Sequence, residues 1–173
     1  QGRPPVTIVD SLGRQVAVPK TIERIISLEP EITRIIVALG AGEKLVGIDF
    51  FLRHHDHLFP FVFPAAGRLP VVSNQGQELN YEEAISLCPD LVFASPSEFG
   101  MTDSIAKKLK VPVVSLASMG RIGALLEEIG ILGRILGREE RAAQLVAVFR
   151  DRLESLRRPA SSLAGNGRPS IYL

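Results

Sequence analysis

The stretch Arg24-Ile25-Ile26-Ser27-Leu28-Glu29-Pro30-Glu31-Ile32-Thr33 decides the fold. Residues 25–28 form a compact apolar run, which is typical of a strand buried on both faces of a sheet. Pro30 suits the first turn of a helix, where its missing N–H has no intrahelical partner to lose. We expect that helix to run to Leu39 and to stop at Gly40. A buried strand followed at once by a helix is the unit that builds a parallel sheet.

The same alternation continues along the chain. Strands are predicted at 44–48, 91–94 and 111–116, and helices at 81–87 and 98–109. Asn80 precedes the first of these helices as an N-cap, with Glu83 at the capping-box position. Upstream, 6–10 and 14–18 are short β-type runs joined at Gly13, which predicts a hairpin. The fold class is therefore α/β, a lobe built on a parallel sheet with helices on its faces.

Two helices are predicted after the last strand, at 122–136 and at about 139–157. The apolar residues of the second recur at helical spacing and form one stripe, opposite a face of Arg and Glu. Residues 159–169 are rich in Pro, Ser, Ala and Gly, which is typical of a linker. Residues 168–173 then begin what reads as a new strand, and we interpret it as the first strand of a second lobe.

Composition limits the function classes. The 173 residues include 20 Lys and Arg against 19 Asp and Glu, a net charge of +1, so no basic surface for nucleic acid is expected. No run approaches the ~18 apolar residues that a membrane span needs. The first residues lack the apolar core of a signal peptide, so a signal peptide is absent from this sequence. Cys88, the single cysteine, is expected to be a small packing residue at a helix end.

Residues 49–79 are the least regular part of the sequence, and we expect a long functional loop there. The loop contains the one metal-ligand-like group of the chain: His54, His55, His57, Asp49 and Asp56. His55 and His57 would face one way in an extended chain. The five phenylalanines of the loop either line an apolar cleft or attach the loop to the core: Phe50, Phe51, Phe59, Phe61 and Phe63. Phe50 and Phe51 are the better cleft candidates.

Three arginines suit a ligand carboxylate, because the guanidinium is planar and forked: Arg53, Arg68 and Arg121. Ser95 and Ser97 lack the strand–turn–helix context of a nucleophile elbow. No arrangement of catalytic residues is therefore predicted, and no resident cofactor is expected.

The motifs, in order and spacing, resemble the helical-backbone class of substrate-binding proteins that serve ABC importers. They include 10–14, the 25–48 segment already quoted, Asn80-Tyr81-Glu82-Glu83 with Cys88-Pro89-Asp90-Leu91, and Leu136-Gly137-Arg138-Glu139. The resemblance implies a chelatase-like, class III binding-protein fold. It divides the chain into an N-terminal ligand-binding lobe (1–136), a bridging helix (137–158), and a linker with the first strand of a missing C-terminal lobe (159–173).

The resemblance also implies a function, namely capture of a ferric siderophore, haem or cobalamin-type ligand between two lobes. The loops after the carboxyl ends of the parallel strands would bind it, as the rule for open α/β sheets also predicts. The expected ligand-binding residues are Glu29, Pro30, Glu31, Asp49, Phe50, Phe51, Arg53, His54, His55, Ser95, Ser97, Met119 and Arg121. His54, His55 and His57 are the candidate metal ligands.

The implied partner is an ABC transporter permease, and the implied location is extracytoplasmic, either free in the periplasm or anchored as a lipoprotein. The family usually has a permease-docking Glu just after the Thr of the first helix, where this chain has Arg34. Glu31, one turn earlier, is the substitute candidate. Three alternatives stay open: a Zn or Mn transport protein, an enzyme or cofactor-assembly protein on a related α/β lobe, and an interaction domain that forms a homodimer through the face left by the missing lobe.

Overall fold

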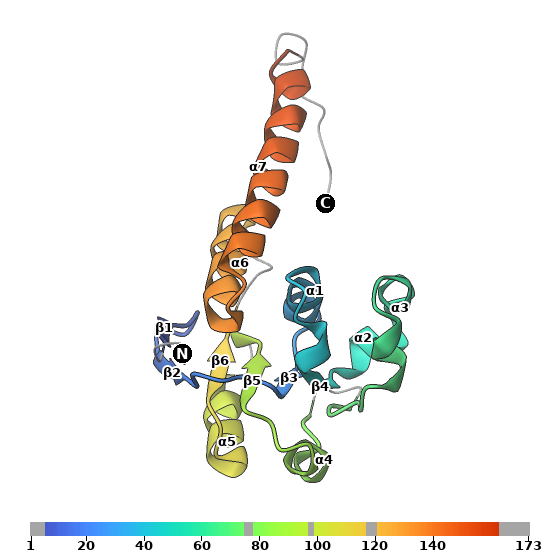
Figure 1. The fold of residues 1–173 in the computed structure, drawn as a ribbon, viewed down its shortest axis with the longest axis vertical. Coiled ribbons are helices and arrows are strands. Elements are labelled where there is room, and N and C mark those ends of the chain that lie inside the picture. The colour runs from blue at the N-terminus through green and yellow to red at the C-terminus, as the bar shows by residue number, and fades with distance from the viewer. Residues whose placement is uncertain (1–5, 75–77, 97–98, 117–120, 163–173) are drawn as a thin grey trace.

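A four-stranded parallel sheet lies at the centre of the molecule (Figure 1). The computed structural model describes residues 6–74, 78–96, 99–116 and 121–162. The strand order is β4-β3-β5-β6, with β3 at Ile25–Ser27, β4 at Leu45–Ile48, β5 at Leu91–Ala94 and β6 at Val113–Ser115. The predicted α/β class with a parallel sheet is confirmed.

Helices cover both faces of the sheet. One face contributes Ile25, Leu91 and Phe93 to a core shared with α1 (Pro30–Ala38), α6 (Ile122–Leu136) and α7 (Glu139–Ser162). The other face contributes Ile26 and Val92 to a second core, against α4 (Tyr81–Ser86) and α5 (Phe99–Leu109). Adjacent residues of one strand point to opposite faces, so a strand between two helical layers must be apolar throughout. This explains the unbroken apolar runs of the sequence.

Much of residues 50–68 is helical rather than a long irregular loop, which corrects the expectation for that part of 49–79. It contains α2 (Phe50–His54), α3 (Phe59–Val62) and the 3₁₀ helix η2 (Pro64–Arg68). A third core cluster of Ile48, Leu52, Phe59 and Ala66 joins them to β4. Two of the prolines that indicated a loop, Pro60 and Pro64, lie in the first turns of α3 and η2, where proline is compatible with a helix.

The long final helix differs in length from its prediction. α7 extends to Ser162, into the segment expected as a linker. Residues 163–173, with the expected strand at their end, lie outside the described residues. The division into lobe, bridging helix and missing lobe therefore stays a prediction.

Two local expectations around α4 were wrong. Cys88 is exposed rather than packed, and it has a positive φ of 44°, whereas Pro89 next to it is buried. The Asn80 side chain does cap α4, accepting the Glu83 N–H at 3.2 Å. In a capping box the Glu83 side chain would accept the Asn80 N–H. Here that N–H donates instead to the Val72 carbonyl at 2.8 Å.

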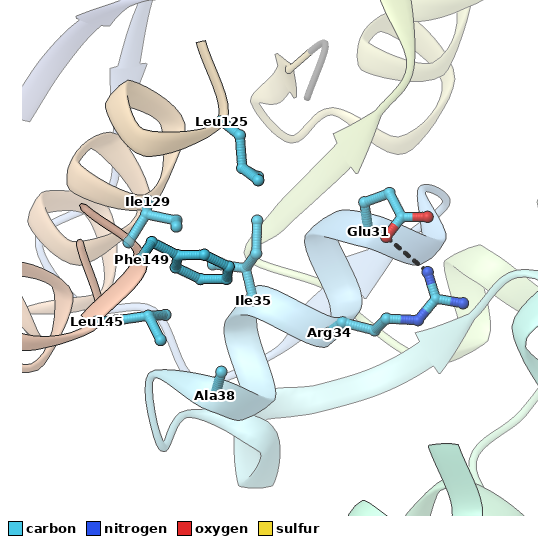
Figure 2. Close-up of a pocket in the computed structure, with 8 residues that line it drawn as sticks. All are labelled: Glu31, Arg34, Ile35, Ala38, Leu125, Ile129, Leu145 and Phe149. Atoms are coloured by element: carbon cyan, nitrogen blue, oxygen red, sulfur yellow. Dashed lines mark ion pairs between the residues drawn. The ribbon is translucent and has the colours of Figure 1, made fainter. Parts of the chain in front are cut away.

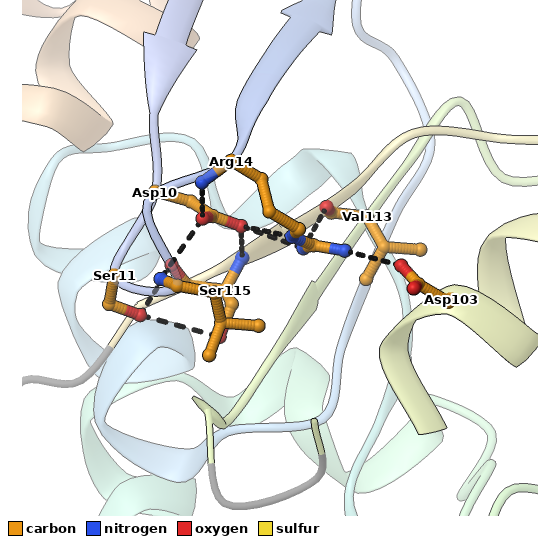
Figure 3. A network of polar contacts seen from close by, with 7 residues as sticks. Asp10, Ser11, Arg14, Asp103, Val113 and Ser115 are labelled. Carbon is orange, nitrogen blue, oxygen red and sulfur yellow. Dashed lines mark hydrogen bonds and ion pairs between the residues drawn. The ribbon is translucent and has the colours of Figure 1, made fainter. Parts of the chain in front are cut away.

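The predicted hairpin is present, and the Asp10 carboxylate is one of the groups that join it to the sheet (Figure 3). It consists of antiparallel strands β1 (Val6–Val9) and β2 (Gln15–Val18). Asp10 Oδ1 accepts the backbone N–H groups of Leu12 and Arg14, both at 3.0 Å. Asp10 Oδ2 accepts Arg14 Nη2 at 2.7 Å and the Ser115 N–H of β6 at 3.2 Å. Burial alone would raise the pKa of Asp10, but these hydrogen bonds outweigh burial and lower it.

We expect Asp10→Asn to lower the free energy of unfolding by about 3 kcal/mol, the usual cost of breaking a buried pair from one side. The folded pKa of Asp10 lies below its unfolded value, so its stabilisation is present at neutral pH and is lost as the pH falls through the folded pKa. Urea titrations between pH 7 and 3 should therefore show the advantage of the wild type shrinking. Asp103→Asn is the control, since Asp103 pairs with the same arginine from an exposed position. Its loss should stay below about 1 kcal/mol.

A glycine permits the close contact between α6 and α7. A Cβ added to Gly133 of α6 would lie 2.5 Å from the Ala142 Cβ of α7, a separation that real Cβ atoms essentially never show. Gly137, with a left-handed φ of 68°, turns the chain between the two helices. The pair therefore packs nearly backbone to backbone at its base.

Two glycine substitutions on the same helix should have opposite effects. Gly133→Ala should destabilise the protein by about 1–3 kcal/mol, the usual cost of overpacking. Gly130→Ala should stabilise it by about 0.5–1 kcal/mol through helix propensity, because no atom lies within 4 Å of the added Cβ. Thermal and urea unfolding of both variants measures this difference. Equal effects would contradict a tight contact at Gly133.

Candidate functional site

The carboxyl ends of all four parallel strands lie at one edge of the sheet. After β3 the chain continues to β4 on one side, whereas β5 pairs with β3 on its other side. The direction of winding therefore reverses between β3 and β5, and open α/β sheets bind ligands in the crevice outside such a point. Glu29–Glu31 follow β3 and Ser95 follows β5, so these predicted site residues flank the crevice.

The turn from β3 into α1 is held by side-chain hydroxyls. Thr33 Oγ1 donates to Ser27 Oγ at 2.8 Å, and the Thr33 N–H donates to the Glu29 carbonyl at 3.0 Å. Ser27 and Thr33 are both buried. Pro30 occupies the first turn of α1, as predicted. The backbone of Glu29 is thus fixed, and its side chain is half-buried at the edge.

Arg34 connects α1 to the segment after β4. Its Nη1 lies 2.6 Å from Glu31 Oε2, and its Nη2 lies 2.6 Å from Asp56 Oδ2. Asp56 Oδ1 in turn accepts the N–H groups of Leu58 and Phe59, at 3.0 and 2.9 Å. Burial alone would raise the pKa of Asp56, but the hydrogen bond from Arg34 and the two N–H groups lower it. The Glu31 carboxylate is engaged by Arg34, and permease docking by Glu31 stays a prediction.

Asp49 is a buried carboxylate at the start of α2. Its residue is 4% exposed. Oδ1 accepts the Leu52 N–H at 2.8 Å and caps the helix. No group that the structure describes donates a hydrogen bond to Oδ2. Burial raises the pKa of Asp49 to about 6, although the backbone bonds at α2 and the charge of Arg34 act in the opposite direction.

The three histidines are exposed and lie on or just after α2. The His54 ring lies 4.3 Å from the Phe50 ring and the His55 ring lies 5.4 Å from the Phe51 ring, between centroids. His54 is the last residue of α2 and His55 is its C-cap, with φ −117° and ψ −18°, so His55 does not have the extended conformation expected for His55 and His57. Within the described ranges, no three His, Cys, Asp or Glu side chains are placed to hold a metal ion. Metal ligation by His54, His55 and His57 stays a prediction.

The phenylalanines divide between the two roles considered. Phe59 is buried, and its ring centroid lies 6.0 Å from that of Phe63, so these two attach the segment to the core. Phe50 is half-buried, and Phe51 is 49% exposed after β4. Phe61 is exposed on α3. The two better cleft candidates are therefore also the two placed directly after a sheet strand.

The arginines and remaining site candidates have different surroundings. Arg53 Nη1 donates to the Ala66 carbonyl at 2.7 Å, which joins α2 to η2. Arg68 is exposed, and Arg121 is exposed just before α6. Ser95 is half-buried after β5. Ser97 and Met119 lie outside the described residues.

A cavity between α1, α6 and α7 was not foreseen from the sequence (Figure 2). Its volume is about 300 Å³. Its lining is apolar apart from one ion pair at its side: Glu31, Arg34, Ile35, Ala38, Leu125, Ile129, Leu145 and Phe149. Leu145 and Phe149 belong to the apolar stripe predicted for the last helix. The lining residues from α1 are three or four positions apart, so they lie on one face of that helix. Only the tertiary packing shows that these faces leave a space.

We expect Asp49→Asn to stabilise the protein at pH 8. The folded pKa of Asp49 is raised to about 6. The stabilising effect of its neutral form is therefore complete below the unfolded pKa and is lost as the pH rises through about 6. Removing the buried charge should gain at most about 3 kcal/mol at pH 8, and the gain should vanish near pH 4.

Asp56→Asn is the matched control, because it removes a carboxylate that has all its partners. It should destabilise the protein at pH 8. Urea titrations of the two variants at pH 4 and pH 8 make the comparison. A less stable Asp49→Asn at pH 8 would contradict an unfavourable buried charge.

Known proteins resemble the chain over most of its length. It is 28% identical to YvrC of Bacillus subtilis, named as an uncharacterised ABC transporter substrate-binding lipoprotein, over 98% of this chain and 52% of that protein. It is 26% identical to a cobalamin-binding protein of Halobacterium salinarum, over 97% of this chain and 43% of that protein. The chain thus spans about half the length of these relatives.

A solved structure shows the same arrangement of elements. The periplasmic solute binding protein of Veillonella parvula superposes with a TM-score of 0.78 at 25% identity, over 88% of this chain and 47% of that protein. The named relatives are binding proteins, which agrees with the expectation of no enzyme. In the part of the chain that the structure describes, no helix combines the length and apolar character needed to cross a membrane.

The family itself follows from a match over most of the sequence. Residues 25–173 fit the model of a family described as periplasmic binding protein. The fitted range begins at β3, the first strand of the parallel sheet. The resemblance seen in the sequence is confirmed, and this chain belongs to the periplasmic binding protein family.

Proposed function

We propose that this chain is the ligand-capturing lobe of an extracytoplasmic solute-binding component of an ABC importer. Its cargo would be a ferric siderophore, haem or a cobalamin-type ligand. The four parallel strands bring their following loops to one edge. The observation that carries the proposal is the reversal of winding between β3 and β5 at that edge, the position at which open α/β sheets bind ligands. Membership of the periplasmic binding protein family supports the same role.

The side chains at this edge suit a large ligand with flat apolar parts. Phe50 and Phe51 lie after β4, and the rings of His54 and His55 lie against them in tilted arrangements. Binding sites are mostly apolar, with a few polar groups that orient the ligand. A neutral imidazole is also a ligand for haem iron. The cobalamin-binding relative supports a corrinoid as one member of the proposed ligand class.

Capture would be non-covalent and would use a second lobe. Relatives of about twice this length leave room for one, and α7 leads away from the sheet edge (Figure 1). A long helix resists bending more than a loop hinge, so closure would be a small rocking motion. The captured ligand would then pass, on the extracytoplasmic side, to the membrane permease of an ABC transporter, as the name of the Bacillus relative suggests.

Titration of the chain with cyanocobalamin, haemin and a ferric siderophore tests the proposal. At least one should raise the melting temperature, because a ligand that binds only the folded state stabilises it. Phe51→Ala should weaken that binding about tenfold, the effect of losing ~1.4 kcal/mol of apolar contact. For haemin, a shift of the Soret band that disappears in the His54→Ala/His55→Ala variant would identify the iron ligand.

Phe61→Ala is the control, since Phe61 is exposed on α3 rather than directly after a strand. It should leave the affinity unchanged. Absence of binding for all three ligands, in this chain and in a two-lobed version, would overturn the proposal. Equal losses of ligand affinity in Phe51→Ala and Phe61→Ala would overturn the assignment of ligand binding to the carboxyl edge of the sheet.

A further inference from the structure

The guanidinium of Arg34 joins two of the segments that meet at the carboxyl edge of the sheet. Its Nη1 lies 2.6 Å from Oε2 of Glu31, in the first turn of α1 directly after β3. Its Nε and Nη2 lie 2.9 and 2.6 Å from Oδ2 of Asp56, which follows α2. Figure 2 shows the Arg34 side chain extending away from the apolar lining of the cavity, toward Glu31. We call this arrangement, Glu31–Arg34–Asp56, the guanidinium bridge.

Apolar packing joins the same two segments farther from the edge. Val37 of α1 packs against the cluster that contains Leu52 and Phe59. Val37 lies three residues after Arg34, whereas α1 begins at the carboxyl edge of the sheet. The segments after β3 and β4 are therefore held together by apolar contacts below and by the guanidinium bridge nearer the edge.

The helix that carries Phe50 and Phe51 is held at both of its ends. At its start, the Phe50 N–H donates to Ser73 Oγ at 3.0 Å. Beyond its end, Asp56 accepts two N–H groups at the start of α3 and is itself held by Arg34. α2 has only five residues, and a helix so short is not stable by itself. The placement of Phe50 and Phe51 therefore depends on these end contacts.

The residue type at position 34 suits a bridge. The guanidinium interacts with three carboxylates, of which it pairs with Glu31 and Asp56. Burial raises the pKa of the third, Asp49, and the charge of Arg34 opposes that rise. A planar fork can donate to two carboxylates at once, whereas a lysine ammonium acts as a single point charge.

The bridge has more influence on local position than on global stability. The side chains of Arg34 and Glu31 are 35% and 33% exposed, and that of Asp56 is 11% exposed. Ion pairs with this degree of exposure contribute little to the free energy of unfolding. They instead influence how freely one segment moves relative to the rest of the fold.

We propose that Arg34 is a positioning residue for ligand capture. By holding Glu31 and Asp56 together, it sets the separation between the turn after β3 and the aromatic side chains of α2. The edge is then formed before a ligand arrives, which lowers the entropic cost of binding. Arg34 acts through these segments and does not itself contact the ligand. The inference rests on the proposed function, because it concerns the same edge.

A single tryptophan tests the positioning role without any ligand. The chain contains no tryptophan, so Phe51→Trp places one indole at the edge, at a position that is 49% exposed. Adding Arg34→Gln to this reporter should about double the amplitude of its nanosecond motion, measured by time-resolved fluorescence anisotropy. Arg34→Lys, which keeps the charge and loses the fork, should give an intermediate amplitude. The melting temperature should change by no more than about 4 °C.

Two controls show whether the effect is local. Arg141→Gln removes an arginine that donates to the Ala38 carbonyl at 2.7 Å, at the opposite end of α1. It should leave the motion of the Phe51→Trp reporter unchanged. A second reporter, Ile85→Trp on α4, should not respond to Arg34→Gln. Unchanged motion at position 51 in Arg34→Gln, or an equal increase at position 85, would overturn the proposal.

Ligand titration separates this inference from the proposed function. Cyanocobalamin, haemin and a ferric siderophore are titrated into the Arg34→Gln and Arg141→Gln variants of the otherwise wild-type chain. A ligand that binds the wild type should bind Arg34→Gln about tenfold more weakly and Arg141→Gln with unchanged affinity. Unchanged affinity in Arg34→Gln would overturn the positioning role and leave the proposed function intact. Absence of binding to the wild type would count against the proposed function, whereas the anisotropy would still decide whether Arg34 positions α2.

Discussion

The structure depends on a sheet that is covered on both faces. Ile25 and Ile26 are neighbours in β3, both are completely buried, and they belong to separate core clusters. Helices must therefore pack on each side, and the connections between layers must pass around the ends of the strands. The proposed binding edge is a consequence of this constraint, because four parallel strands all end on the same side.

Much of the fold could be predicted because its signals are local. The apolar run at 25–28, Pro30 in the first turn of α1 and the cap at Asn80 are each recognisable within a few residues. The helices after β4 could not be predicted in the same way. Their prolines resemble those of a loop, and their stability comes from Asp49, Asp56 and the cluster around Leu52. The exposure of Cys88 and its positive φ were likewise not predicted.

The candidate site could be predicted in outline and not in its electrostatics. The rule for parallel sheets selects the loops from sequence alone. It does not show that Arg34 joins Glu31 to Asp56, 22 residues away along the chain from Arg34. Nor does it show that Asp49 keeps an oxygen without a hydrogen-bond donor in the described structure. Both depend on contacts between α1 and the segment after β4, two elements that no sequence periodicity connects.

The close contact between Gly133 and Ala142 fixes the angle between α6 and the base of α7. At 1.5 Å per residue, the 24 residues of α7 form a rod of about 36 Å. A tilt of about 5° at the base would move the far end of such a rod by about 3 Å. The side chains at this contact therefore set the direction in which α7 points, and a single methyl group added there would tilt the helix.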